Sequence, residues 1–368
     1  MRTVLLRRVI ASCPLLIWML IPVTSHAEPP RTRVPYIHST DLLHPHEDPD
    51  DHFDLATAYA LEELDIRAIL LDLGDRQKLR SGRLPVEQLN KLTGRRVPSA
   101  AGLSVALKSP DDKGLDQPKE DQGAIELLLK VLRESSEPVI LNTLGSERDV
   151  CAAFNREPEL LRKKISRLYV NAGGLKGDER EWNVRLDPLS YVGLMRSGLP
   201  ISWCPCQPTN VNLSTHWVFK HKDVLESMPA GLLNFFIYAL QRVPPGEIDP
   251  MAALAMDLRP WRHILMEQDR NMWSTASILD AAGRSIYRVG DRWVAARSAP
   301  AGGQLAEVFR FIPVRVEIDN RAVTRWKEAP GDPTMRVYQV ADAKNHQAAM
   351  ASCLRQVLEN FPVVTGLQ

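Results

Sequence analysis

The sequence predicts an α/β fold, a mostly parallel, doubly wound sheet with helices on both faces. Two observations lead to this class. Short apolar segments rich in β-forming residues alternate with segments of helical periodicity from residue 34 to residue 206, and such an alternation builds a parallel sheet because each helix connects two strands. The chain has 368 residues, 44% hydrophobic and 25% charged, which is enough to bury a large core.

The first strand, helix and second strand are the clearest elements. Residues 34–40, VPYIHST, form a short apolar run, and residues 66–73, IRAILLDL, are again strand-like. Between them, one helical face carries Phe53, Ala56, Ala60 and Leu64. We therefore expect a strand, a helix and a second strand in this order.

The same unit then recurs along the chain. Residues 86–103 combine a helix, a stop at Gly94 and a strand, and residues 123–145 combine a helix, a polar break and the β-rich PVILNTL. Residues 148–174 and 187–206 continue the alternation. Ligands of such sheets bind beyond the carboxyl ends of the strands, so the loops that follow the strands are expected to hold the functional site.

Residues 1–27 have the composition of an export signal. They contain basic MRTVLLRR, the apolar run VIASCPLLIWMLIPV, and small residues at Ser25 and Ala27. We expect cleavage after Ala27, a single domain of residues 28–368, and an exported protein in the periplasm or outside the cell. An uncleaved anchor is the alternative. No later run approaches the ~20 apolar residues of a membrane-spanning helix, so we expect no stable membrane insertion.

Charge and cysteine content exclude two further classes. The 46 Lys and Arg balance 45 Asp and Glu, and no basic stripe interleaves with aromatic residues, so the footprint of a nucleic-acid-binding protein is missing. Beyond the signal, Cys151, Cys204, Cys206 and Cys353 lack paired C-x-x-C spacing, which argues against a zinc site. One disulfide and buried free thiols both stay open.

The most unusual stretch is TDLLHPHEDPDDHFDLATAYAL, residues 40–61. Between Asp41 and Leu55 it holds five Asp, one Glu and three His. Like charges on one loop repel, so such a loop is either spread out in water or binds something positive. Its place after the first strand, on the ligand-binding edge of the sheet, favours the second interpretation.

This stretch also resembles a known family. Asp41 after a strand, then Asp50 and Asp51 leading into a helix of small residues, is similar to the Asp-rich N-terminal motif of the inosine-uridine-preferring nucleoside hydrolases. Four later segments resemble that family in the right order: residues 92–103, 139–154, 168–205 and 247–260. The resemblance covers roughly the first two-thirds of the chain after the signal, and the C-terminal third is less diagnostic.

The resemblance implies a calcium-dependent hydrolase of N-glycosidic bonds in ribonucleosides or related ribosides. The Ca²⁺ ligands would be Asp41, Asp51, the backbone carbonyl of Arg148 and Asp249, with Asp41 also the general base for the attacking water. The sugar would be held by Asp50, Glu181 and Asn183. The residue types suit this chemistry, because Ca²⁺ takes hard oxygen ligands and a buried diol needs charged or amide partners. The implied partner is a small nucleoside or riboside, with a homo-oligomer as a further expectation.

Some residues depart from the family pattern. Ser39 replaces the first Asp of the motif, the link LLHPHEDP is longer than usual, and Ile248 replaces the His before the distal Asp. A non-catalytic, calcium-dependent sugar-binding protein on the same scaffold is therefore the alternative function. His44, His46 and His52 are expected to line or shield the mouth of the pocket.

Local alternatives exist as well. Asp50, Asp51 or Asp249 could cap a helix, the last with Pro250 at the first helical position. The sequence HPHED also has the His-x-His-x-Asp spacing of zinc hydrolases, but Pro49 follows Asp48 and no matching downstream ligands are evident.

Overall fold

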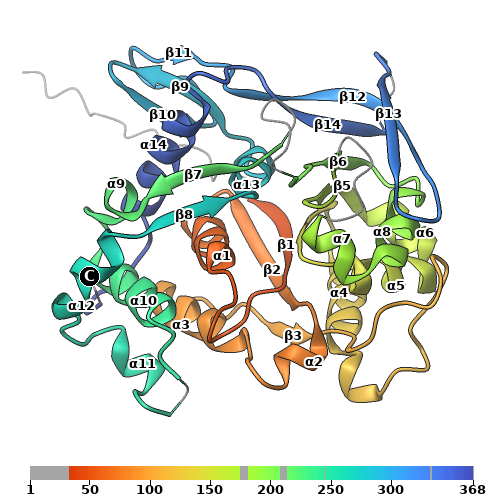
Figure 1. The fold of residues 1–368 in the computed structure, drawn as a ribbon, viewed down its shortest axis with the longest axis horizontal. Coiled ribbons are helices and arrows are strands. Elements are labelled where there is room, and N and C mark those ends of the chain that lie inside the picture. The colour runs from red at the N-terminus through yellow and green to blue at the C-terminus, as the bar shows by residue number, and fades with distance from the viewer. Residues whose placement is uncertain (1–32, 175–180, 208–213, 245, 332–333, 368) are drawn as a thin grey trace, which may run out of the picture. The chain divides into compact units, whose positions relative to one another are not determined.

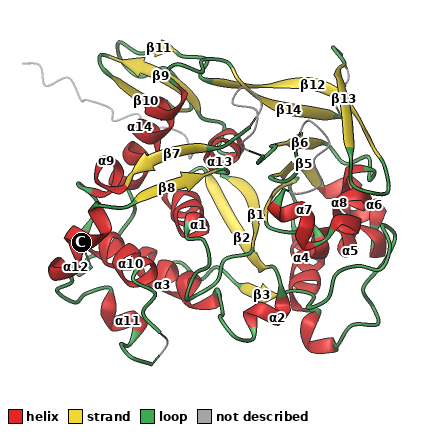
Figure 2. Ribbon diagram, in the orientation of Figure 1, coloured by secondary structure: helices red, strands yellow, loops and turns green. Residues whose placement is uncertain are grey.

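A nine-stranded sheet forms the centre of the computed structural model, which describes residues 33–174, 181–207, 214–244, 246–331 and 334–367 (Figures 1 and 2). In spatial order its strands are β13 (Thr324–Glu328), β12 (Phe309–Ile318), β14 (Met335–Val340), β6 (Ile201–Trp203), β5 (Ile165–Val170), β4 (Val139–Leu144), β1 (Val34–Thr40), β2 (Leu64–Leu71) and β3 (Ser99–Ala101). Every pair from β14 to β3 is parallel, and β12 pairs antiparallel with β14 and β13. The predicted α/β class is confirmed.

Helices cover both faces of this sheet, as the alternation of its side chains requires. On β1, Tyr36 belongs to one apolar core and Ile37 to the other, because successive side chains of a strand point to opposite faces. The first core includes α1 (Asp50–Ala60), α3 (Arg83–Thr93), α10 (Ala230–Leu240), α13 (Thr275–Ala281) and α14 (His346–Glu359). The second includes α4 (Gly123–Glu134), α5 (Arg148–Arg156), α6 (Pro158–Lys164) and α8 (Pro188–Met195).

Smaller elements complete the unit. Two antiparallel sheets are formed by β7 (Trp217–Lys220) with β8 (Asp269–Met272), and by β9 (Ser285–Val289) between β10 (Arg292–Ala296) and β11 (Gln304–Leu305). The short helices are α2 (Gly74–Gln77), the 3₁₀ turn Lys119–Asp121, α7 (Trp182–Leu186), α9 (His221–Leu225), α11 (Pro250–Ala253) and α12 (Arg259–Met266). Arg33 to Gln368 cluster as one compact unit, and none of the described helices is long and apolar enough to cross a membrane. The predicted signal, residues 1–27, lies outside the described residues.

Local sequence signals explain several boundaries. The helix α3 stops at Gly94, whose φ of 67° is left-handed, a conformation that glycine adopts without the steric cost of a Cβ. The helix α1 ends earlier than its periodicity predicts, because Leu61 has extended dihedral angles. Leu64, expected on the apolar face of that helix, instead begins β2.

The order of the strands shows where on the sheet a ligand-binding crevice is expected. From β1 the chain adds β2 and β3 on one side and then returns to add β4, β5 and β6 on the other. At such a reversal the helices on either side diverge and leave a crevice at the carboxyl ends of the two central strands. Those ends are Thr40 of β1 and Leu144 of β4.

Candidate active site

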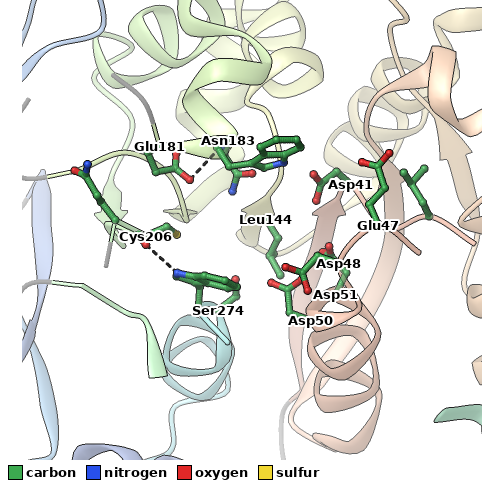
Figure 3. A pocket seen from close by; sticks show the side chains of 14 residues that line it. Asp41, Glu47, Asp48, Asp50, Asp51, Leu144, Glu181, Asn183, Cys206 and Ser274 are labelled. Carbon is green, nitrogen blue, oxygen red and sulfur yellow. Dashed lines mark hydrogen bonds between the residues drawn. The ribbon is translucent and has the colours of Figure 1, made fainter. Parts of the chain in front are cut away.

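A cavity of about 590 Å³ lies at this reversal (Figure 3). Its lining comes from the β1–α1 loop and the start of α1, from the end of β4, from the start of α7 and the residue before it, from the segment after β6, and from the two residues before α13. The lining residues are Asp41, Leu43, Glu47, Asp48, Asp50, Asp51, Leu144, Glu181, Trp182, Asn183, Cys206, Gln207, Trp273 and Ser274. The sequence prediction that ligands bind after the first strand therefore agrees with the position of the cavity.

One side of the cavity, here called the acidic wall, carries Asp41, Asp50 and Asp51. Asp41 directly follows β1, while the other two form the first turn of α1, where the helix dipole favours negative charge. Asp51 is 7% exposed and accepts a hydrogen bond from the Thr40 hydroxyl. The strand end and the helix start thus bring three predicted site residues together.

The ionisation of the acidic wall is strongly perturbed. Burial, followed by the neighbouring charge of Asp72, raises the pKa of Asp41 to about 7, although hydrogen bonds with Asp51 and Trp182 oppose the shift. Burial also raises the pKa of Asp50 and Asp51 well above the usual range, and nearby carboxylates add to both shifts. Without a cation to offset the repulsion, these groups are not all ionised together at neutral pH, and some of them keep a proton.

Asp72 ties the ends of β2 and β4 beneath Asp41. Its carboxylate accepts hydrogen bonds from the Leu73 amide at 2.8 Å, the Ser146 amide at 2.6 Å and the Ser146 hydroxyl at 2.9 Å. Glycine is required between these partners, because a Cβ on Gly145 would lie 2.7 Å from Asp72 Oδ2 and 3.1 Å from the Asp41 Cβ. Asp72 was not among the residues predicted from sequence, although it directly follows β2 in the same way that Asp41 directly follows β1.

The opposite side, here called the facing wall, carries Glu181, Asn183, Trp273 and Ser274. The Glu181 carboxylate accepts backbone amides of Gly173 at 2.8 Å, Asn183 at 3.0 Å and Val184 at 3.0 Å. The Asn183 side chain donates to the Asn171 carbonyl at 2.8 Å. Glu181 and Asn183, two of the three predicted substrate residues, line the cavity, and both also hold the backbone around α7 in place.

The rest of the facing wall comes from residues that were not predicted from sequence. Trp273 donates its indole N–H to the Cys206 carbonyl at 2.8 Å, and Ser274, 4% exposed, directly precedes α13. Figure 3 shows Ser274 and Cys206 on the side of the cavity that faces Asp50 and Asp51. A signal was available, since Trp273 and Ser274 stand at a junction between a short strand and an apolar helix.

Two predicted calcium ligands are not brought to the cavity lining. Asp249 is exposed and caps α11, where it accepts the Ala252 amide at 2.6 Å with Pro250 at the first helical position. The capping alternative therefore explains this residue, and its role as a calcium ligand stays a prediction. Arg148 begins α5 with its side chain bound to Asp187 and to the Leu103 carbonyl. It is not among the lining residues, and the role of its carbonyl stays a prediction.

The three histidines of the β1–α1 segment do not line the cavity mouth, contrary to expectation. They are buried against α10, with His44 Nε2 at 2.7 Å from the Val243 carbonyl and His46 Nε2 at 3.4 Å from the Leu240 carbonyl. The ring of His52 lies near both of the other two and near Phe235. The three histidine rings therefore hold the β1–α1 loop, which carries the acidic wall, against α10 and the residues that follow it.

The structure also bears on the zinc interpretation of the HPHED sequence and on the state of the four cysteines. Within the described ranges, no group of three or more His, Cys, Asp or Glu side chains is arranged to hold a metal ion, which gives the His-x-His-x-Asp zinc interpretation no support. Cys151, Cys204, Cys206 and Cys353 are all buried free thiols. Of the two alternatives for the cysteines, the structure therefore has free thiols.

Comparisons with known proteins agree with this arrangement. A profile of the family described as inosine-uridine preferring nucleoside hydrolase matches residues 39–348. The pyrimidine-specific ribonucleoside hydrolase RihA of Escherichia coli is 30% identical over 173 residues, which are 41% of this chain and 55% of that relative. The chain thus matches just over half the length of this curated relative.

Two solved structures share the fold at low sequence identity. The plant nucleoside hydrolase PpNRh1 has a TM-score of 0.54 and 16% identity, covering 90% of this chain and 99% of that one. The purine-preferring ribonucleoside hydrolase from Gardnerella vaginalis has a TM-score of 0.50 and 16% identity, covering 88% and 99%. Since the family profile extends over most of the sequence, from the end of β1 into α14, this chain belongs to the inosine-uridine preferring nucleoside hydrolase family.

Proposed function

We propose that the protein hydrolyses the N-glycosidic bond of ribonucleosides or related ribosides. The observation that carries the proposal is the acidic wall: three carboxylates from the end of β1 and the start of α1 line one cavity at the reversal of the strand order. Its volume of about 590 Å³ lies within the usual range for small-molecule sites. Membership of the nucleoside hydrolase family supports the same reaction.

The cavity lining contains polar side chains that suit a sugar and apolar rings that suit a flat base. Asp50, which lines the cavity, would accept hydrogen bonds from the 2- and 3-hydroxyls of a ribose, because a carboxylate accepts with both oxygens. Asn183 and Glu181 bound the sugar from the facing wall. Trp182 and Trp273 add apolar surface to the lining, which suits the aromatic base of a nucleoside.

The reaction balances with Asp41 as general base. A water molecule forms a new bond from its oxygen to the anomeric carbon and gives one proton to the Asp41 carboxylate. The bond from that carbon to the base nitrogen breaks, and its electron pair leaves with the base, which then takes up a proton. A base works best with a pKa close to the working pH. Burial raises the pKa of Asp41 to about 7 in the cation-free protein, and a bound cation would lower it again.

A divalent cation, with Ca²⁺ as the first candidate, belongs to the proposal. The oxygens of Asp41 and Asp51 are of the kind that Ca²⁺ takes, and a cation between them would offset their repulsion. When bound, such an ion lowers the pKa of a coordinated water. The donor set is suitable in kind but short in number, since no group of three metal-binding side chains is found within the described ranges.

Non-catalytic binding of a sugar or nucleoside is the second candidate. The observation that favours it is the lining itself, in which the described residues include no histidine to protonate a departing base. Export to the periplasm or beyond and assembly into a homo-oligomer remain proposals from the sequence.

A reducing-sugar assay over a panel of purine and pyrimidine nucleosides separates the two candidates. We expect ribose release by the wild type and its loss after Asp41→Asn. Asp249→Asn is the matched control, because this exposed helix cap lies outside the cavity lining. Tight nucleoside binding with no ribose release from any substrate would establish the binding function instead.

A further inference from the structure

The cation site of the proposed function has its ligands on one side only. Asp41 and Asp51 both come from the segment that joins β1 to α1. The family resemblance implies a further Asp from a distant part of the chain, and Asp249 was the residue expected to supply it. That residue instead caps α11 at the surface.

Ser274 lies at the place from which a facing ligand would come. It is 4% exposed, lines the same cavity as Asp41 and Asp51, and stands across from Asp50 in Figure 3. Its backbone is fixed, because its carbonyl accepts the Ile278 amide at 3.2 Å and the Ser277 hydroxyl at 2.7 Å. Its side chain does not cap α13 and instead hydrogen-bonds the buried carboxyl group of Asp54.

We infer that Ser274 supplies a neutral hydroxyl where the cation site needs a facing carboxylate, so that the protein binds Ca²⁺ weakly and Ser274→Asp completes the site. The inference rests on the cation of the proposed function. Ligand charge is one of the two features, with site rigidity, that tune calcium affinity over orders of magnitude. One added carboxylate on a fixed backbone is therefore expected to lower the Ca²⁺ dissociation constant by about tenfold or more.

The binding experiment needs no nucleoside. Ca²⁺ affinity is measured by calorimetry, and Tb³⁺ affinity by luminescence, for which Trp182 and Trp273 in the lining act as sensitisers. We expect weak binding by the wild type, tighter binding by Ser274→Asp, and wild-type affinity for the uncharged control Ser274→Asn. Equal affinities of wild type and Ser274→Asp would overturn the inference, as would loss of wild-type binding after Asp249→Asn.

Folding of the variant is controlled separately. The introduced carboxylate would lie beside Asp54, which is 1% exposed, so repulsion between the two could unfold the chain in the absence of a cation. The double variant Asp54→Asn with Ser274→Asp removes that repulsion and retains the new ligand. If this folded double variant also binds Ca²⁺ no more tightly than Asp54→Asn alone, the inference fails, whereas ribose release by the wild type would still support the hydrolase.

Discussion

The two walls of the cavity hold their carboxyl groups in different surroundings. On the acidic wall, burial raises the pKa of Asp41, Asp50 and Asp51, and the charges of neighbouring carboxylates, Asp72 in the case of Asp41, add to each shift. On the facing wall, burial also raises the pKa of Glu181, but three backbone amides donate to its oxygens and oppose the shift. A carboxylate with its lone pairs occupied by the backbone serves the structure, and one held near others of like charge is available for chemistry.

The sharpest test of this difference is Asp41→Asn on the acidic wall. An amide cannot take the proton of the attacking water, so turnover should fall by about 10²–10⁴-fold. Since Asn keeps the size of the side chain and removes one of several repelling charges, the free energy of unfolding should not decrease. Steady-state kinetics and urea denaturation measure the two effects. Turnover within a few-fold of wild type would move the base to another residue.

The second test concerns protonation of the leaving group. The described residues that line the cavity include no histidine, so a departing base must leave without protonation from an imidazole. We expect p-nitrophenyl riboside, with its stable leaving group, to be hydrolysed about 10²–10⁴-fold faster than inosine, as judged from kcat/KM. Similar values for the two substrates would reveal a proton donor in the site.

The acidic wall was predictable from sequence, whereas most of the facing wall was not. Asp41 follows a strand and Asp50 begins the next helix, so the periodicity of the sequence locates both at the ligand-binding edge of the sheet. Asp249 shows the limit of that reasoning, because an Asp before Pro250 has the same local pattern as a ligand at a helix start. Ser274 follows β8, a four-residue strand of mostly polar residues, and the long-range pairing of β8 with β7, which local periodicity does not predict, brings it to this part of the fold.

The third test concerns the support of the acidic wall. The ring of His221 packs on Phe53 of α1, and its Nε2 lies 3.4 Å from Arg270 Nε. Burial, followed by the charge of Arg270, lowers the pKa of His221 to about 4. In the unfolded chain the pKa is about 6.5, so between these values the unfolded state binds more protons.

The contribution of His221 to the free energy of unfolding is therefore fully present above pH 6.5. It is lost as the pH falls toward 4, by up to ~3 kcal/mol. Thermal unfolding from pH 4 to pH 7 measures the dependence in wild type and in His221→Phe, which retains a ring but cannot titrate. We expect a shallower pH dependence in the variant. Identical slopes would show that His221 contributes nothing to acid sensitivity.

The smallest expected effect comes from Glu181→Gln on the facing wall. The substituted amide keeps the shape of the side chain and one acceptor oxygen, but its NH₂ group meets backbone amides that also donate. Loss of a hydrogen bond to a charged acceptor costs about 1.5–3 kcal/mol, and we expect a decrease of that size in the free energy of unfolding, measured in urea. Because the Gly173 and Val184 amides share Oε2 while Asn183 uses Oε1, the backbone around α7 should loosen and KM should rise more than kcat falls. A loss of kcat as large as that of Asp41→Asn, with stability unchanged, would mean that Glu181 takes part in the chemistry. The distinction between a catalytic acidic wall and a structural facing wall would then be wrong.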